Sequence, residues 1–205
     1  LKALSYFHHL DPEFNKMAQK ELIEIIESNS NMPQVYAYLA NTYTWSFLYG
    51  QCEPPIICFA KASEATRKAL SLDENDVNAL GSAAVLSLYK KDHENAIAYI
   101  KKALSVQPNG AHCYVIFGNI LRSMDRSNEA ISIIKKGILL NPYPLHWYYS
   151  GLGMAYTDSG QYDEAIKAFK KSIEIDPSWI AYLGLAIVYG HLGYEKEAKE
   201  TVSEL

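Results

Sequence analysis

YDEAIKAFKKSIEIDP, residues 162–177, decides the fold, because the chain contains the same pattern twice more. The earlier copies are AIAYIKKALSVQP, residues 96–108, and AISIIKKGILLNP, residues 130–142. In all three copies an alanine opens the pattern, a proline closes it at the same spacing, and apolar residues recur three and four positions apart. That spacing places the apolar side chains on one side of an α-helix. The sequence therefore predicts three equivalent helices, each buried along one face.

A second apolar stretch of helix length precedes each copy, and a short polar segment joins the two. These stretches are NALGSAAVLSLY, residues 78–89, AHCYVIFGNILRSM, residues 111–124, and HWYYSGLGMAYTDS, residues 146–159. Two helices with a short connection form an αα-hairpin, and here the whole hairpin recurs with a period of about 34 residues. A single hairpin cannot bury its apolar side alone, so we expect the copies to stack and share a core.

This period, and large–small pairs such as Leu152-Gly153 in the preceding stretches, resemble the tetratricopeptide repeat. The resemblance is strong for residues 77–178 and weaker on both sides. It implies an all-α fold, a right-handed α-solenoid of tandem helix-turn-helix pairs in a single domain over residues 1–205. The expected repeats cover residues 1–32, 33–76, 77–110, 111–145, 146–178 and 179–205. The chain begins with Leu1 rather than Met and its last helix has an unfinished apolar side, which predicts a fragment of a longer polypeptide.

The second repeat contains an insertion near residues 46–57. Pro54-Pro55 interrupts the helical pattern there, and Gly50 is a typical helix end. Two interpretations remain open: a lengthened helix followed by a plain loop, or a lip that covers one end of a binding groove.

Residues 1–142 also resemble the repeat region of bacterial signalling proteins in which tetratricopeptide repeats follow a class III adenylate or guanylate cyclase domain or a winged-helix domain. The shared features are the glycine-then-proline interruption in an early repeat and the run KALSLDE at residues 68–74. This resemblance implies a cytoplasmic, regulatory module, and not the activity of the neighbouring domain.

Composition and motifs argue against several classes of function. A net charge of −4 without a basic stripe argues against nucleic-acid binding, and no apolar run approaches the ~20 residues of a membrane span. The odd count of three cysteines suits a reducing compartment. We therefore expect Cys52, Cys58 and Cys113 to be core or incidental residues that hold no metal. No catalytic or nucleotide-binding motif occurs, so we expect a non-catalytic protein without a cofactor.

The resemblance also implies a binding surface, because the first helix of each pair lines the concave face of a tetratricopeptide solenoid. Among the five first helices from residue 34 onward, only Arg122 and Asp158 are charged. We therefore expect a neutral, aromatic groove that binds a peptide or a helix of a protein partner. The site residues implied by the resemblance are Asn41, Trp45, Asn78, Tyr89, His112, Asn119, Arg122, Trp147, Ser150 and Met154, with Gln34, Thr44, Val85 and Val115 as further inward positions. The alternative for each aromatic residue is packing between neighbouring repeats.

The identity of the occupant stays open. A separate protein or peptide, another domain of the same polypeptide, or a second copy of the chain would each fit a neutral groove, and the last would make the chain a self-association module. A third function class is a small-molecule sensor, with a pocket under the loop at Gly50–Phe59 and above Trp45.

Overall fold

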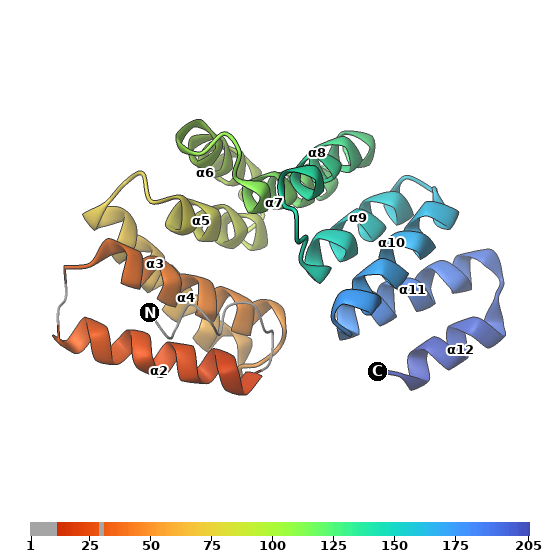
Figure 1. Ribbon diagram of the computed structural model, residues 1–205, viewed down its shortest axis with the longest axis horizontal. Coiled ribbons are helices and arrows are strands. Elements are labelled where there is room, and N and C mark those ends of the chain that lie inside the picture. Colours follow the sequence, from red (N-terminus) through yellow and green to blue (C-terminus); the bar gives the residue numbers. More distant parts are fainter. Residues whose placement is uncertain (1–11, 29–30) are drawn as a thin grey trace. The chain divides into compact units, whose positions relative to one another are not determined.

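The computed structural model describes residues 12–28 and 31–205, and the regular elements in this part of the chain are α-helices (Figure 1). They are α2 (Pro12–Ser28), α3 (Pro33–Leu48), α4 (Pro55–Leu72), α5 (Val77–Tyr89), α6 (His93–Val106), α7 (Ala111–Arg122), α8 (Ser127–Leu140), α9 (His146–Asp158), α10 (Tyr162–Ile175), α11 (Trp179–Leu192) and α12 (Glu195–Ser203). From α3 onward, consecutive helices pack as pairs: α3 with α4, α5 with α6, α7 with α8, α9 with α10, and α11 with α12. The prediction of an all-α fold of the solenoid type is confirmed. None of the described helices is long and apolar enough to cross a membrane.

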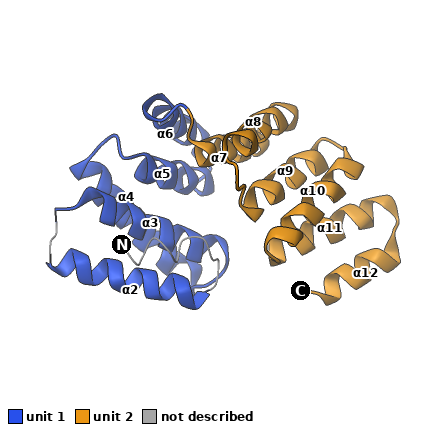
Figure 2. Cartoon of the chain, in the orientation of Figure 1, with its two compact units in different colours: residues 1–108 blue, residues 109–205 orange. Residues whose placement is uncertain are grey.

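The chain divides into two compact units, residues 1–108 and residues 109–205 (Figure 2). The first contains α2–α6 and the second contains α7–α12. Their largest fully buried side chains include Leu22 and Val35 in the first unit, and Tyr148 and Phe169 in the second. The prediction of a single domain over the whole chain stays a prediction.

Proline, aspartate and glycine set several helix boundaries. α4 begins at Pro55, where the fixed φ of proline suits the first helical turn. Asp76 caps α5, and its carboxylate accepts a hydrogen bond from the backbone N–H of Ala79 at 2.9 Å. Gly193 caps the C-terminus of α11, and its φ of 76° lies in the left-handed region that favours glycine.

Small residues let helices of the second unit approach one another closely around Phe169. The Phe169 ring is fully buried in the core formed by α9, α10 and α11. A Cβ added at Gly153 of α9 would lie 2.8 Å from this ring, and one added at Gly184 of α11 would lie 2.4 Å from it. Both contacts are too short for a real Cβ, so the glycines make room for the phenylalanine.

Half of the insertion in the second repeat is helical. α3 continues to Leu48 and α4 starts at Pro55, so the connection is residues 49–54. Gln51 in this connection donates its backbone N–H to the carbonyl of Ser46 at 2.8 Å. The structure thus supports the interpretation of a lengthened helix followed by a loop.

Cys52 and Cys58 form a disulfide, with Cα atoms 6.0 Å apart. The expectation of a core residue holds for Cys58, which is 1 % exposed, but the sequence did not reveal its pairing with Cys52. The Gly50 turn and the start of α4 at Pro55 bring these positions, six residues apart, face to face. Cys113 is a buried free cysteine, as predicted, and burial raises the pKa of its thiol to about 11.

Candidate functional site

The two charged residues of the first helices neutralise each other. Arg122 ends α7 and Asp158 ends α9, the first helices of consecutive repeats in the second unit. Arg122 Nη1 lies 2.9 Å from Asp158 Oδ2, and both side chains are partly exposed. A partly exposed ion pair contributes at most about 1 kcal/mol, but it leaves this face of α7 and α9 without net charge. That agrees with the expected neutral surface.

Asn41 and Asn119 occupy the same position of two different repeats, directly after Leu39-Ala40 and Phe117-Gly118. Each lies against the first helix of the following repeat. The Asn41 Oδ1 atom of α3 accepts a hydrogen bond from the hydroxyl of Ser82 in α5. Asn119 of α7 faces Gly151 of α9, at the position equivalent to Ser82, and a Cβ added at Gly151 would lie 3.1 Å from Asn119 Oδ1.

The two asparagines therefore differ in their hydrogen bonding. Glycine has no side chain to donate, and Asn119 Oδ1 is buried without a hydrogen-bond partner within the described part of the chain. A buried amide oxygen left in this state costs about 1–3 kcal/mol. A rotation of the amide by half a turn exchanges its oxygen and nitrogen, so Asn119 can present either a donor or an acceptor outward.

An aromatic cluster lies on the same two helices as Asn119 and Gly151, formed by His112 of α7 with Trp147 and Tyr148 of α9. The rings of His112 and Trp147 stack with centroids 5.6 Å apart, and the Tyr148 ring meets both edge-on. Tyr148 is fully buried, whereas Trp147 is half-buried and His112 is exposed. Trp147 thus packs partly against the core and presents part of its ring to the surface, so both interpretations of the aromatic residues hold in part.

Ser150 does not lie on this surface. It is 3 % exposed, and its hydroxyl lies 2.8 Å from that of Ser172, which donates to the backbone carbonyl of His146. Thr44 and Val115 are also buried, at 6 % and 0 %. The placement of these three residues in an open groove is wrong, because their side chains pack inside the helix layers. Met154 is half-buried and packs against the core of the second unit.

The first unit carries the remaining predicted residues. Trp45 is half-buried and packs at a tilt against Tyr49, with ring centroids 5.4 Å apart. Tyr89 is 54 % exposed and meets the ring of Phe47 edge-on at 4.9 Å. Asn78 is exposed at the start of α5. Gln34 is exposed and Val85 is half-buried.

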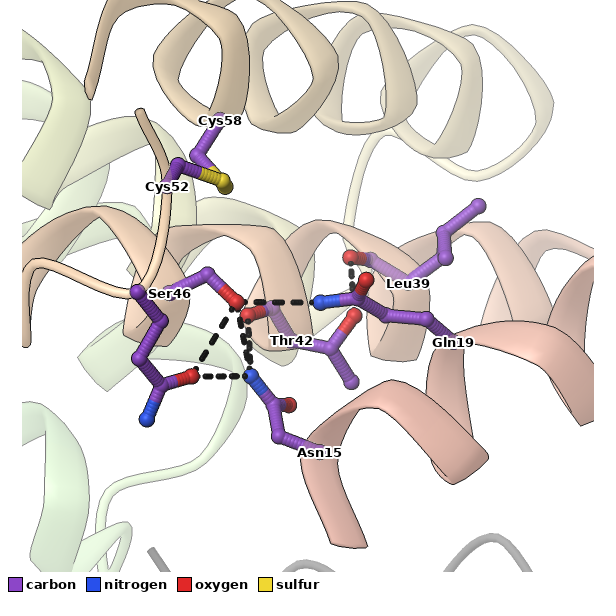
Figure 3. The surroundings of a disulfide bond; sticks show 8 residues. Asn15, Gln19, Leu39, Thr42, Ser46, Cys52 and Cys58 are labelled. Carbon is purple, nitrogen blue, oxygen red and sulfur yellow. Dashed lines mark hydrogen bonds between the residues drawn. A yellow bond between two sulfur atoms is a disulfide. The ribbon is translucent and has the colours of Figure 1, made fainter. Parts of the chain in front are cut away.

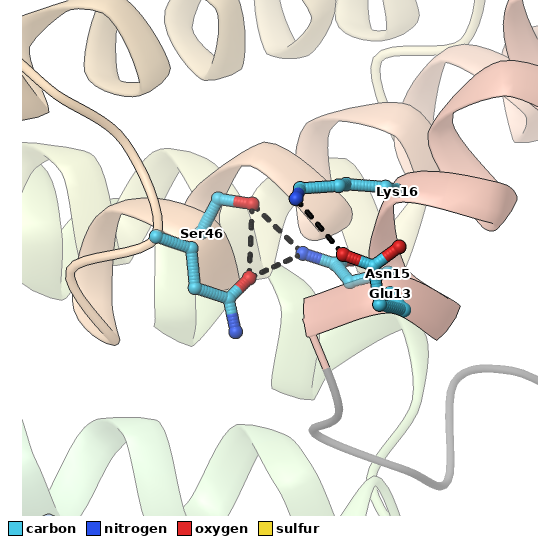
Figure 4. A network of polar contacts seen from close by, with 5 residues as sticks. Glu13, Asn15, Lys16 and Ser46 are labelled. Atoms are coloured by element: carbon cyan, nitrogen blue, oxygen red, sulfur yellow. Dashed lines mark hydrogen bonds and ion pairs between the residues drawn. The ribbon is translucent and has the colours of Figure 1, made fainter.

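A polar network that the sequence analysis missed joins α2 to the end of α3 (Figures 3 and 4). Asn15 Nδ2 donates to Ser46 Oγ at 2.8 Å and to Gln51 Oε1 at 3.0 Å, and Gln19 Nε2 donates to Ser46 Oγ at 3.0 Å. Figure 4 also shows the exposed ion pair between Lys16 and Glu13 on the same helix. The network holds the α3–α4 connection against α2. Its only sequence signal is the pair of amides on the buried side of α2.

The described residues show no group of three or more histidine, cysteine, aspartate or glutamate side chains that could hold a metal ion. The site can contact a ligand through asparagine amides and partly exposed aromatic rings, and the charges of its ion pair cancel.

Three segments match models of the tetratricopeptide repeat: residues 77–109, 111–144 and 146–178. The UDP-N-acetylglucosamine–peptide N-acetylglucosaminyltransferase of Giardia intestinalis is 27% identical over 164 residues, which are 80% of this chain and 11% of that protein. The chain spans about a tenth of the length of the first curated relatives that it matches.

Solved structures agree with the repeat assignment. The crystal structure of MamA is 29% identical, with a TM-score of 0.55 over 72% of this chain and 86% of that one. PilW, a type IV pilus biogenesis factor, is 22% identical, with a TM-score of 0.68 over 84% of this chain and 75% of that one. The three matched segments within residues 77–178 are therefore tetratricopeptide repeats, and the chain is a helical scaffold of the kind that binds protein partners.

Proposed function

We propose that this chain binds an extended, neutral peptide segment of a protein partner on the face of α7 and α9 that contains Asn119. The observation that carries the proposal is the difference between the two equivalent asparagines. Asn41 accepts a hydrogen bond from Ser82, whereas Asn119 faces Gly151 and keeps an amide oxygen for which the described residues provide no partner. A peptide backbone offers both an N–H and a C=O, so it can bond whichever amide atom Asn119 presents outward.

The surroundings of Asn119 favour a neutral segment with aromatic or apolar side chains. The Arg122–Asp158 pair neutralises the only charges of α7 and α9, so a charged ligand gains little there. The half-buried Trp147, stacked on His112, offers rigid aromatic area of the kind that dominates interface energies. From the sequence resemblance alone, we further propose that the module is cytoplasmic and regulatory, within a bacterial signalling protein.

A displayed library of random peptides provides the test, because it requires no knowledge of the natural partner. Peptides selected on the wild-type chain should lose about tenfold in affinity for Asn119→Ala, the effect of one hydrogen bond of about 1.4 kcal/mol. Asn41→Ala is the matched control and should bind the same peptides normally. Equal losses in both variants, or no loss with Asn119→Ala, would contradict the proposal.

The free energy of unfolding should distinguish the same two variants in the opposite way: Asn41→Ala, which binds peptides normally, should be the less stable of the two. Asn41→Ala removes the acceptor of the Ser82 hydroxyl and should lower the free energy of unfolding by about 1 kcal/mol. Asn119→Ala removes an oxygen that has no partner among the residues that the structure describes, so the stability of this variant should be unchanged or higher. Gly151→Ser adds the missing donor opposite Asn119 and should weaken peptide binding without unfolding the protein.

A second candidate is self-association through the outer side of α11 and α12, where the structure has an apolar groove of about 420 Å³. Its lining residues are Leu183, Ala186, Ile187, Ala198, Lys199 and Val202. Val202 is 52 % exposed, whereas Phe169, at the same position of the preceding repeat, is fully buried under α11. The occupant that we consider is the same groove of a second copy, because twofold dimers use one self-complementary patch on both subunits.

Light scattering over a hundredfold range of concentration separates the two candidates. Self-association predicts a mass that rises above 23.1 kDa in the wild type and stays constant in Ile187→Glu. Leu139→Glu, at an 86 % exposed position of α8, is the control and should behave like the wild type. A constant mass in all three proteins would exclude self-association and leave peptide binding.

A further inference from the structure

We propose that Cys52 and Cys58 form a reversible thiol-exchange site, at which a low-molecular-weight thiol opens the disulfide and loosens the connection between α3 and α4. The two cysteines lie in different surroundings (Figure 3). Cys52 lies in the connection and is half-buried, whereas Cys58 lies in the first turns of α4 and is 1 % exposed. The inference concerns the first unit and does not depend on peptide binding at Asn119.

This difference in burial determines which of the two sulfur atoms an external thiolate attacks. A thiolate from solution can approach the sulfur of Cys52, but the core side chains around Cys58, such as Leu39 and Tyr43, shield the other sulfur. Attack forms a bond between the external sulfur and Cys52 and breaks the Cys52–Cys58 bond. Cys58 leaves as a thiolate and takes a proton from water.

The exchange has two balanced continuations. The Cys58 thiolate can attack the mixed disulfide on Cys52, which restores the protein disulfide and releases the small thiol. Alternatively, a second small thiol attacks the mixed disulfide at its own sulfur. The products are then two protein thiols and the disulfide of the small thiol, so the protein is reduced and two small thiols are oxidised.

Residues on both sides of the disulfide limit what reduction can release. Gln51 stays attached to Asn15 through its side chain and to Ser46 through its backbone N–H. The helical hydrogen bonds of α4 hold the chain again from Ile57, whose N–H bonds the carbonyl of Pro54 at 3.0 Å. The change is therefore centred on the short segment 52–57 and its immediate neighbours, and the rest of α3 and α4 stays folded.

The segment is coupled to an exposed aromatic surface through Phe59, which follows Cys58 directly. Phe59 meets the ring of Phe47 edge-on at 5.2 Å, and Phe47 meets Tyr89 in the same way at 4.9 Å. The ammonium of Lys90 lies 5.6 Å from the Phe59 ring centre. Tyr89 is 54 % exposed, so a shift at the start of α4 changes a surface that a partner can touch. Disulfides in reducing compartments are mostly of this transient, redox-sensing kind.

Mass spectrometry with glutathione tests the chemistry on the full chain. After incubation with oxidised glutathione, alkylation under denaturing conditions should modify one cysteine, Cys113, and after full reduction it should modify all three. In a mixed glutathione buffer, the trapped adduct should be on Cys52. Three alkylated cysteines in the oxidised sample, or an adduct on Cys58, would overturn the proposal.

Hydrogen exchange tests the structural consequence. Reduction should increase the exchange of backbone amides in residues 50–60. It should also lower Tm by about 5 °C, because the unfolded chain gains conformational entropy when the disulfide no longer closes a loop. Cys52→Ser should show the fast exchange in both redox conditions. Cys113→Ala is the matched control, which keeps the pair and should respond to reduction like the wild type. Identical exchange of residues 50–60 in oxidised and reduced wild-type protein would sink the idea.

Discussion

The hydroxyl of Tyr148 forms the polar contacts of the aromatic cluster of the second unit. Its oxygen lies 2.5 Å from His112 Nδ1 and accepts a hydrogen bond from Asn141 Nδ2 at 3.4 Å. Because Asn141 can only donate through this nitrogen, the Tyr148 O–H is left to donate to His112. Burial raises the pKa of Tyr148 to about 12, so the phenol stays neutral at physiological pH. The ring can then serve as a rigid support for His112 and Trp147.

Tyr148→Phe should be less stable than the wild type near neutral pH and more stable than the wild type at alkaline pH. Near pH 8 the variant should be less stable by about 1 kcal/mol, because it lacks the two hydrogen bonds. A phenol with a raised pKa in the folded state stabilises the fold below the unfolded pKa of about 10 and loses that contribution as pH rises through 12. The wild type should therefore lose about 2 kcal/mol by pH 12 that the variant does not lose.

Urea unfolding of both proteins from pH 8 to pH 12 measures this difference. Comparing the two curves removes the contribution of other groups with raised pKa values, such as Cys113 and Tyr43. Parallel curves over the whole range would show that Tyr148 titrates in the folded protein as it does in the unfolded chain.

At the scale of the element, α11 shows how glycines in one helix can have different roles. Gly184 faces the Phe169 ring, and its added Cβ would lie 2.4 Å from ring carbons that cannot move away easily in a packed core. Gly190, six residues further along the same helix, has no atom within 4 Å of its added Cβ. Packing requires the first glycine, whereas the second only lowers helix propensity.

Alanine at these two positions should therefore change stability in opposite directions. Gly184→Ala should lower the free energy of unfolding by about 1–3 kcal/mol through overpacking. Gly190→Ala should raise it by about 0.5–1 kcal/mol, because alanine restricts the unfolded chain and favours the helix. Thermal unfolding of both variants and the wild type measures the two changes in stability. A stability loss in Gly190→Ala as large as that in Gly184→Ala would contradict the distinction.

The same elements show how far the sequence leads. The three-fold recurrence of the alanine-to-proline pattern predicts α6, α8 and α10 correctly, because helix periodicity and repeat spacing are local properties of the chain. The partner of a side chain on the next repeat is not local. Asn41 and Asn119 are equivalent in sequence, and only the residue across the helix interface, Ser82 or Gly151, distinguishes them. The position of Ser150 is a different case, because its hydroxyl contacts Ser172 on the second helix of its own pair, a packing detail that helix periodicity does not specify.

At the scale of the whole molecule, each compact unit has its own apolar core. The buried cluster around Phe169 draws its residues from 115 to 189, and the cluster around Leu22 draws its residues from 22 to 86. Repeat proteins derive their stability from individual repeats and the interfaces between neighbours rather than from one central core. A unit that keeps its helices and the interfaces between them should therefore keep most of its stability when it is produced alone.

Residues 109–205 produced alone should accordingly fold, with a helical circular dichroism spectrum and one cooperative thermal transition. The fragment retains α7–α12 and the contacts that bury Tyr148 and Phe169. Phe169→Ala in the same fragment should lose about 3–5 kcal/mol, most of the stability of a domain of this size, and should abolish the cooperative transition. A gradual, non-cooperative loss of helix in the unmodified fragment would mean that the second unit requires residues 1–108 to fold. Peptide binding at Asn119 would then have to be measured only in the full chain, because the face of α7 and α9 would not exist without the first unit.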